Sequence, residues 1–174
     1  MNKSLKYLLL FLLFCLLQAF VFERMQLGPF LYPTIYLLFI LLFPFGYQTI
    51  YLLLWSFAMG FCIDILSAGV LGLHTSATLC TGLLRQNILK LVATKGDVGQ
   101  LRSPGIYALG YLRYFTYVVL SLLIHHSVLF GLETFHFSYL PFTFTRILCS
   151  AVLNVTFILL LQALFFDQKR SSDS

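Results

Sequence analysis

Long apolar blocks separated by short polar stretches form the dominant pattern of this chain. Six blocks follow one another, over residues 5–22, 25–43, 45–66, 70–84, 107–130 and 146–166. A helix needs roughly 20 apolar residues to cross a hydrocarbon core about 30 Å thick. The pattern therefore predicts an all-α integral membrane protein with six transmembrane helices, in one polytopic domain over residues 1–170 with a polar tail at 171–174.

The boundary between the second and third blocks is short. Pro44 ends a helix and Gly46 supplies a flexible turn, which favours a tight hairpin between two spans. The alternative is a single broken or re-entrant segment. At 1.5 Å rise per residue the whole stretch 25–66 is too long for one crossing, and this favours two.

The first block is preceded by Lys3 and Lys6, as a signal peptide would be. No small-x-small cleavage site follows it, and the bulky Phe14 before Cys15 argues against a lipoprotein signal. We therefore expect a retained first span.

Composition and charge support the membrane interpretation. The 174 residues are 60% hydrophobic and 10% charged, against about 25% charged in soluble domains, which leaves no room for a soluble catalytic domain. The net charge of +5 comes from basic residues scattered between apolar blocks, so nucleic acid is not an expected partner.

The basic residues also predict the orientation. Six spans place both termini on one side, together with nine basic residues: Lys3, Lys6, Arg85, Lys90, Lys95, Arg102, Arg113, Lys169 and Arg170. Arg24 and Arg146 lie on the other side. Because cytoplasmic loops carry the excess of Lys and Arg, both termini are expected in the cytoplasm.

Two connections each allow two interpretations. Residues 85–92 combine apolar positions with cations, which suits either a short interfacial helix with its cations toward anionic lipid or a fourth span that simply continues. Residues 135–144 are rich in aromatic side chains, as in an interfacial aromatic belt or an exposed docking edge for a partner.

The stretch from Gly60 to His74 is the most informative part of the sequence. It reads G-F-C-I-D-I-L-S-A-G-V-L-G-L-H, and its Asp64 is an acidic residue inside an apolar block. A charge near the centre of a membrane helix costs roughly 2.5–3.5 kcal/mol, and the C-terminal end of a helix disfavours a negative charge. A donor is therefore expected, with four candidate side chains: His74, Ser67, Arg24 and Arg146.

Two roles are open for this stretch. Asp64 and Ser67 would cap helix ends at a turn, with Gly69 and Gly72 allowing the tight turn or a close helix approach. In the functional alternative, the same residues form a buried polar hinge that fixes how the third and fourth spans meet another membrane protein.

These fifteen residues resemble the signature of the rod shape-determining protein MreD family. The matching positions are Gly60, Asp64, Gly69, Gly72 and His74, and no catalytic residue or cofactor comes with them. The resemblance implies a bacterial inner-membrane scaffold of the cell elongation complex, which regulates cell shape and peptidoglycan synthesis through contacts with an MreC-like single-span protein, an MreB-like actin homologue, and the wall glycosyltransferase and transpeptidase. It also implies a fold similar to the six-helix substrate-binding subunits of energy-coupling-factor vitamin transporters.

A vitamin-transporter subunit of that class is the alternative function. Such a subunit usually carries an Ala-x-x-x-Ala pattern in its first span, where this chain has Ala19 alone. A solute pocket also needs several convergent polar side chains, and few lie within the blocks: Gln18, Asp64, His125, His126, Asn154 and Gln162.

An enzyme or a metal protein is not expected. His125 and His126 point about 100° apart on a helix and cannot grip one metal, so we expect one to face a neighbouring helix and the other the lipid boundary. The four cysteines lack metal-ligand spacing: Cys15, Cys62, Cys80 and Cys149. Asn154 and Gln162, eight residues apart, share one face of the last span, where interhelical hydrogen bonds are favoured over partner contact.

Overall fold

The computed structural model describes residues 3–25, 27–44, 48–67, 70–93, 104–134 and 140–166. Within these ranges the chain is helical and has no strand, which confirms the all-α prediction. Three helices are long and apolar enough to cross a membrane, over Thr49–Leu66, Tyr111–Glu133 and Leu140–Leu164. Six membrane crossings stay a prediction.

The elements follow in a fixed order along the chain. They are α1 (Lys3–Leu17), the π-helical turn η1 (Gln18–Phe22), α2 (Leu37–Leu41), α3 (Thr49–Leu66), α4 (Leu73–Val92), α5 (Ile106–Leu109), α6 (Tyr111–Glu133), α7 (Leu140–Leu161) and the π-helical turn η3 (Gln162–Phe166). Five of the six predicted ranges thus hold a long helix.

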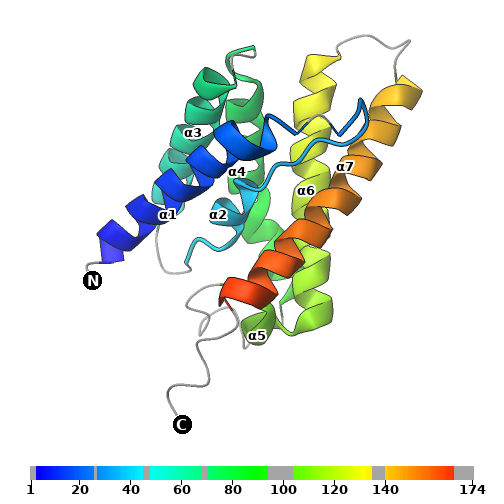
Figure 1. Cartoon of the computed structure of the whole chain (residues 1–174). Helices are drawn as coiled ribbons and strands as arrows, with labels where there is room; N and C mark the ends of the chain where they lie inside the picture. The colour runs from blue at the N-terminus through cyan, green and yellow to red at the C-terminus, as the bar shows by residue number, and fades with distance from the viewer. Residues whose placement is uncertain are drawn as a thin grey trace.

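Helix α4 is the centre of the bundle. It packs against α3 on one side and α6 on the other, and α6 in turn packs against α7. Helices α1 and α7 slant across the front of this layer, with α2 between them (Figure 1). Helix α1 begins and η3 ends toward the same end of the bundle in this view.

The second predicted range, 25–43, differs from the expectation. Instead of a long helix, its described part has a non-helical segment at residues 27–34, the extended stretch, followed by the five-residue helix α2. All side chains of α2 are buried. Gly28, Pro29 and Pro33 disfavour helix in the first half of the range, since proline lacks a backbone N–H and restricts the residue before it. This short helix occupies the space between α1, α3 and α4.

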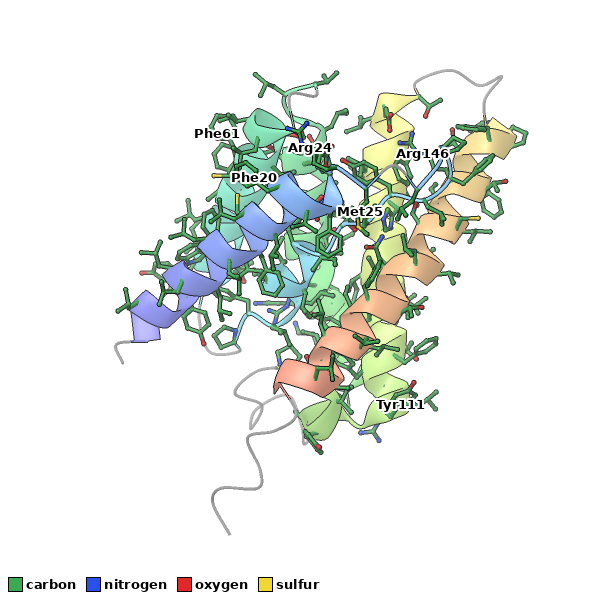
Figure 2. The ribbon with its side chains drawn as sticks, in the orientation of Figure 1. Phe20, Arg24, Met25, Phe61, Tyr111 and Arg146 are labelled. Carbon is green, nitrogen blue, oxygen red and sulfur yellow. The ribbon has the colours of Figure 1, made fainter. Side chains whose placement is uncertain are left out.

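Apolar side chains divide into a buried set and an outward set. Figure 2 shows Phe20, Phe61 and Tyr111 directed away from the bundle, and they are respectively 65%, 43% and 63% exposed. Such wide apolar coverage of the outer surface is the pattern of a protein whose surroundings are lipid.

The structure describes residues 85–92 in full and residues 135–144 in part. Helix α4 runs without a break to Val92, so residues 85–92 continue this helix and do not form a separate one. The first part of the aromatic stretch, 135–139, lies outside the described residues. Its second part opens α7, where Phe142 and Phe144 are exposed.

Candidate functional site

Asp64 caps the amino end of α4. Its carboxylate accepts hydrogen bonds from the backbone N–H groups of Gly72, His74 and Thr75 at 2.8–3.1 Å, and from the Thr75 hydroxyl at 2.6 Å. The first N–H groups of a helix have no partner inside the helix, and the helix dipole favours a negative charge there. A buried carboxylate at the end of α3 therefore fixes the start of α4.

The prediction that the side chain of His74, Ser67, Arg24 or Arg146 donates to Asp64 was wrong. Of the four candidates, His74 contributes through its backbone N–H, and the side chains of Ser67, Arg24 and Arg146 make no hydrogen bond to Asp64. Thr75, which was missed, supplies two of the four bonds. A hydroxyl residue directly after His74 was the available signal, because Thr at the start of a helix readily bonds to nearby groups.

The signature glycines serve the same hairpin in two ways. A Cβ on Gly60 would come within 2.5 Å of Thr75 Cα and 2.7 Å of the His74 carbonyl oxygen, so α3 and α4 meet in near backbone contact there. Gly72 has φ of +99°, a left-handed conformation that L side chains rarely adopt. Gly69, the remaining matched glycine, lies outside the described residues.

The His74 side chain lies in the middle of a series of hydrogen bonds that runs into the bundle. On one side, its Nε2 lies 3.4 Å from the Tyr32 hydroxyl, which donates to the Glu23 carboxylate at 2.8–2.9 Å. On the other side, its Nδ1 lies 2.8 Å from the Tyr36 hydroxyl, which lies 2.9 Å from His125 Nε2. Five side chains from four separate parts of the chain are thus linked in series.

The Glu23 carboxylate at one end of the series assigns a direction to every bond in it. A carboxylate accepts only, so Tyr32 donates to it, and the Tyr32 oxygen is left to accept from His74 Nε2–H. In an uncharged ring His74 Nδ1 then accepts from the Tyr36 hydroxyl, whose oxygen accepts from His125 Nε2–H. His125 Nδ1 is left as a bare acceptor, in agreement with its lack of a partner among the described residues.

A second group of side chains holds the extended stretch before α2. Gln18 binds the Pro33 carbonyl at 2.8 Å and the Ile35 N–H at 3.0 Å. From the opposite side, Asn154 binds the Tyr32 carbonyl at 2.8 Å and the Thr34 N–H. These contacts give non-helical backbone inside the bundle the partners that it needs away from water.

Both adjacent histidines face the interior, which corrects the expectation that one would face lipid. His125 and His126 are each 0% exposed. His126 Nδ1 donates to the Leu122 carbonyl at 2.9 Å, and its Nε2 lies 3.3 Å from Asn154 Nδ2. The expected interhelical role of Asn154 is therefore observed, and Gln162 likewise accepts from Tyr114 at 3.3 Å.

Arg85 is buried rather than turned toward lipid headgroups. It is 2% exposed, and its guanidinium donates to the Tyr117 hydroxyl at 2.9 Å and to the carbonyls of Leu41, at 3.2 Å, and Phe43. Leu41 is the last residue of α2 and Phe43 lies just beyond its C-cap, where carbonyls have no partner within the helix. The side chain acts as a C-terminal cap for α2, so the alternative in which the Arg85 cation faces anionic lipid is wrong.

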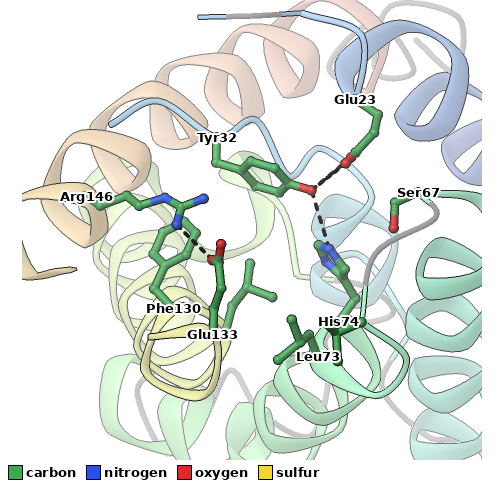
Figure 3. Close-up of a pocket in the computed structure, with 10 residues that line it drawn as sticks. Glu23, Tyr32, Ser67, Leu73, His74, Phe130, Glu133 and Arg146 are labelled. Carbon is green, nitrogen blue, oxygen red and sulfur yellow. Dashed lines mark hydrogen bonds and ion pairs between the residues drawn. The ribbon is translucent and has the colours of Figure 1, made fainter. Parts of the chain in front are cut away.

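A pocket of about 270 Å³, lined by both charged and apolar side chains, lies at the end of the bundle where the Asp64 cap is located (Figure 3). Its lining includes the first two members of the hydrogen-bond series, Glu23 and Tyr32, together with His74, Glu133 and Arg146. Glu23, which directly follows η1, meets residues of the extended stretch, α4, α6 and α7 there. Sequence reasoning missed this convergence because its members are separated by up to 123 positions.

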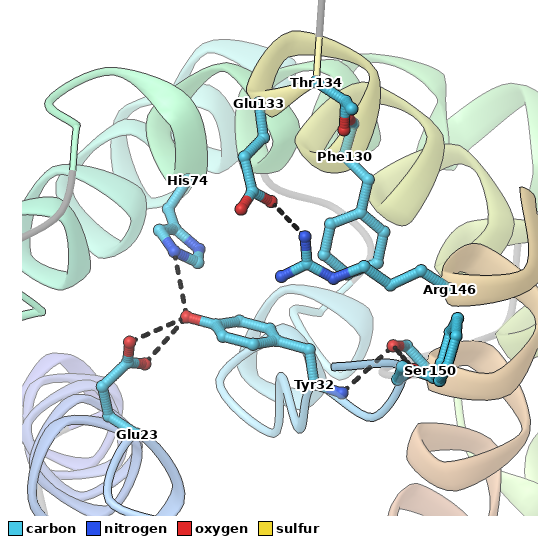
Figure 4. Close-up of polar contacts among 9 residues, drawn as sticks. Glu23, Tyr32, His74, Phe130, Glu133, Thr134, Arg146 and Ser150 are labelled. Atoms are coloured by element: carbon cyan, nitrogen blue, oxygen red, sulfur yellow. Dashed lines mark hydrogen bonds and ion pairs between the residues drawn. The ribbon is translucent and has the colours of Figure 1, made fainter. Parts of the chain in front are cut away.

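Arg146 is the cation of this pocket. Its Nη1 donates to Glu133 Oε2 at 2.8 Å, and its Cζ lies 4.2 Å from the centre of the Phe130 ring. Figure 4 shows this pair on one side of the Tyr32 ring and Glu23 with His74 beyond the hydroxyl. The site thus holds the Arg146–Glu133 ion pair over the Tyr32 ring and the Glu23 carboxylate at the hydroxyl of that ring.

Searches against protein-family models, curated proteins and solved structures find no match to this chain.

Proposed function

We propose that this protein is a membrane scaffold of the rod shape-determining MreD type, which binds a single-span partner and positions cell-wall synthesis enzymes. One observation carries the proposal: the residues that resemble the family signature and are described form one hairpin. Gly60 brings α3 against α4, Asp64 caps α4, and Gly72 makes the turn. The described residues of the signature therefore act together in one structural feature, the hairpin of α3 and α4.

The rigid hairpin presents an apolar stripe on α3. Exposed residues recur at helical spacing along it: Ile50, Leu54, Phe57, Phe61 and Ile65. The rings of Phe57 and Phe61 stack with their centres 5.6 Å apart. We assign this stripe to the single-span partner, since association within a bilayer rests on shape and close packing rather than on the removal of apolar surface from water.

The proposal extends to the partners and to the location. The partners are an MreC-like protein with one span, an MreB-like actin homologue, and the glycosyltransferase and transpeptidase of the elongation complex. The location is the bacterial inner membrane with both termini in the cytoplasm, supported by the basic residues near the termini.

Affinity purification of a tagged chain from its native host, in mild detergent, tests this function. We expect mass spectrometry to find an MreC-like protein together with the wall glycosyltransferase and transpeptidase. The Phe57→Ala/Phe61→Ala double variant should lose most of this recovery, whereas the matched Leu12→Ala/Leu16→Ala variant on α1 should keep it. Recovery of none of these proteins by the wild-type chain would contradict the scaffold.

A substrate-binding subunit of a vitamin transporter is the second candidate. It is favoured by the convergence of Glu23, Tyr32, His74, Glu133 and Arg146 on one pocket, which the sparse polar residues of the sequence did not lead us to expect. The same purification separates the two functions, because a transporter subunit would bring a transmembrane coupling protein and a pair of ATPases.

A further inference from the structure

The Glu23 carboxylate, which lines this pocket, accepts fewer hydrogen bonds than its oxygens can. Both oxygens of Glu23 accept from a single hydroxyl, that of Tyr32, at 2.8 and 2.9 Å. An ionised carboxylate offers about four lone-pair sites. Arg146 forms its ion pair with Glu133. Among the described residues, no cation pairs with Glu23. The group that would complete Glu23 is a cation with several N–H donors.

The other side of the pocket has unused donors. The guanidinium of Arg146 gives one hydrogen bond to Glu133, out of the five N–H donors that such a group carries. Among the described residues, its Nε has no hydrogen-bond partner. The fixed fork of an arginine matches an oxyanion, carboxylate or phosphate. An oxyanion is therefore the group that would complete Arg146.

The side chain of Tyr32 lies near both Arg146 and Glu23. Arg146 Cζ lies 6.0 Å from the centre of the Tyr32 ring, and the hydroxyl of the same ring bonds to Glu23. Leu73, Leu129 and Phe130 also line the pocket and give it apolar walls. The volume of about 270 Å³ lies just below the range of ligand pockets, which run from about 300 to 1,000 Å³, so the ligand has to be small.

We propose that this pocket binds a small zwitterion, with its ammonium group at Glu23 and its oxyanion at Arg146. The pocket lies where α3 and α6 end and α4 begins, at the level that lipid headgroups occupy if the long helices span the bilayer. A phospholipid headgroup and a free solute share this chemistry, and phosphoethanolamine represents it in both forms. The site is independent of the scaffold role, because none of its lining residues belongs to the α3 stripe.

Binding to the full purified chain in detergent micelles tests this inference. The probes are free phosphoethanolamine, diacyl phosphatidylethanolamine, and phosphatidylglycerol as an anion without an ammonium group. We expect a saturable rise of Tm with at least one ethanolamine probe and none with phosphatidylglycerol. A response to the free probe identifies a soluble zwitterion, and a response to the diacyl lipid alone identifies a headgroup. The absence of both responses, or an equal response to phosphatidylglycerol, would overturn the proposal.

Variants locate the two ends of the ligand. Glu23→Gln and Arg146→Gln should each weaken binding at least tenfold, while Glu23→Asp, which keeps the charge, should retain part of it. Arg113→Gln is the matched control, since it lies 20 residues before Glu133 on α6 and so about 30 Å away at 1.5 Å per residue. The Tm of each variant without probe shows that it is folded. Wild-type affinity in folded Glu23→Gln would also overturn the proposal.

Discussion

Asp64 shows, at the scale of the residue, how a charge is kept inside an apolar bundle. The carboxylate is 1% exposed and receives four hydrogen bonds, three of them from backbone N–H groups at the start of α4. A buried charge is tolerated when hydrogen bonds replace its hydration. The sequence indicated that Asp64 needs donors, and it could not show that the helix after the turn supplies them.

Removal of this carboxylate should destabilise the hairpin. In Asp64→Ala the N–H groups of Gly72, His74 and Thr75 lose their acceptor, at a cost of about 2–3 kcal/mol. Asp64→Asn keeps one acceptor oxygen and should lose less. Thermal unfolding in detergent measures both effects, with insertion into the membrane unchanged. Wild-type Tm and wild-type partner recovery in Asp64→Ala would exclude this role.

The protons of the three buried histidines follow from the hydrogen-bond series. His74 and His125 should carry their proton on Nε2, and His126 on Nδ1 because that nitrogen donates to the Leu122 carbonyl. Nitrogen-15 NMR of the labelled protein distinguishes the two tautomers. Tyr36→Phe should change the signals of His74 and His125 and leave those of His126. A single tautomer shared by all three rings would contradict the assigned direction.

At the scale of the element, the stretch before α2 shows where sequence patterns stop being sufficient. Its apolar residues predicted a long helix over 25–43, and the structure has a helix over Leu37–Leu41. The side chains that satisfy its extended backbone, Gln18 and Asn154, lie 15 to 122 positions away. No local pattern reports such partners, whereas the long regular helices follow from composition and length alone.

Asn154 should matter more than the second amide on the same helix face. Asn154→Leu leaves the Tyr32 carbonyl and the Thr34 N–H without this partner, at about 1–3 kcal/mol for buried groups. Gln162→Leu removes a single long bond from Tyr114 and should cost less. Unfolding of both variants in the same detergent gives the comparison, and equal losses would show that the extended stretch does not depend on Asn154.

At the scale of the whole molecule, the hairpin could be predicted and the pocket could not. Gly60, Asp64, Gly72 and His74 lie within fifteen residues, so their cooperation was visible in one stretch. The side chains that line the pocket come from widely separated positions in the chain. The sequence around each of these residues gives no indication of the others. Arg146 was considered as a donor to Asp64, and it pairs with Glu133 instead.

The proposed orientation places the pocket on the side opposite the cytoplasm. In a chain whose native cysteines are replaced, Leu71→Cys at the pocket end should react with a membrane-impermeant maleimide in spheroplasts. Ser172→Cys in the tail should react after permeabilisation, because the positive-inside rule places the tail in the cytoplasm. The reverse pattern of labelling would invert the orientation.

Site-specific photocrosslinking in the native host tests the scaffold account most directly. A photoreactive amino acid at Phe57, on the α3 stripe, should crosslink to a single-span MreC-like protein, and the same amino acid at the similarly exposed Leu12 on α1 should not. Loss of the Phe57 crosslink in Asp64→Ala would tie the contact to the capped hairpin. A crosslink from Phe57 to a transport coupling protein, or to no protein, would contradict the account.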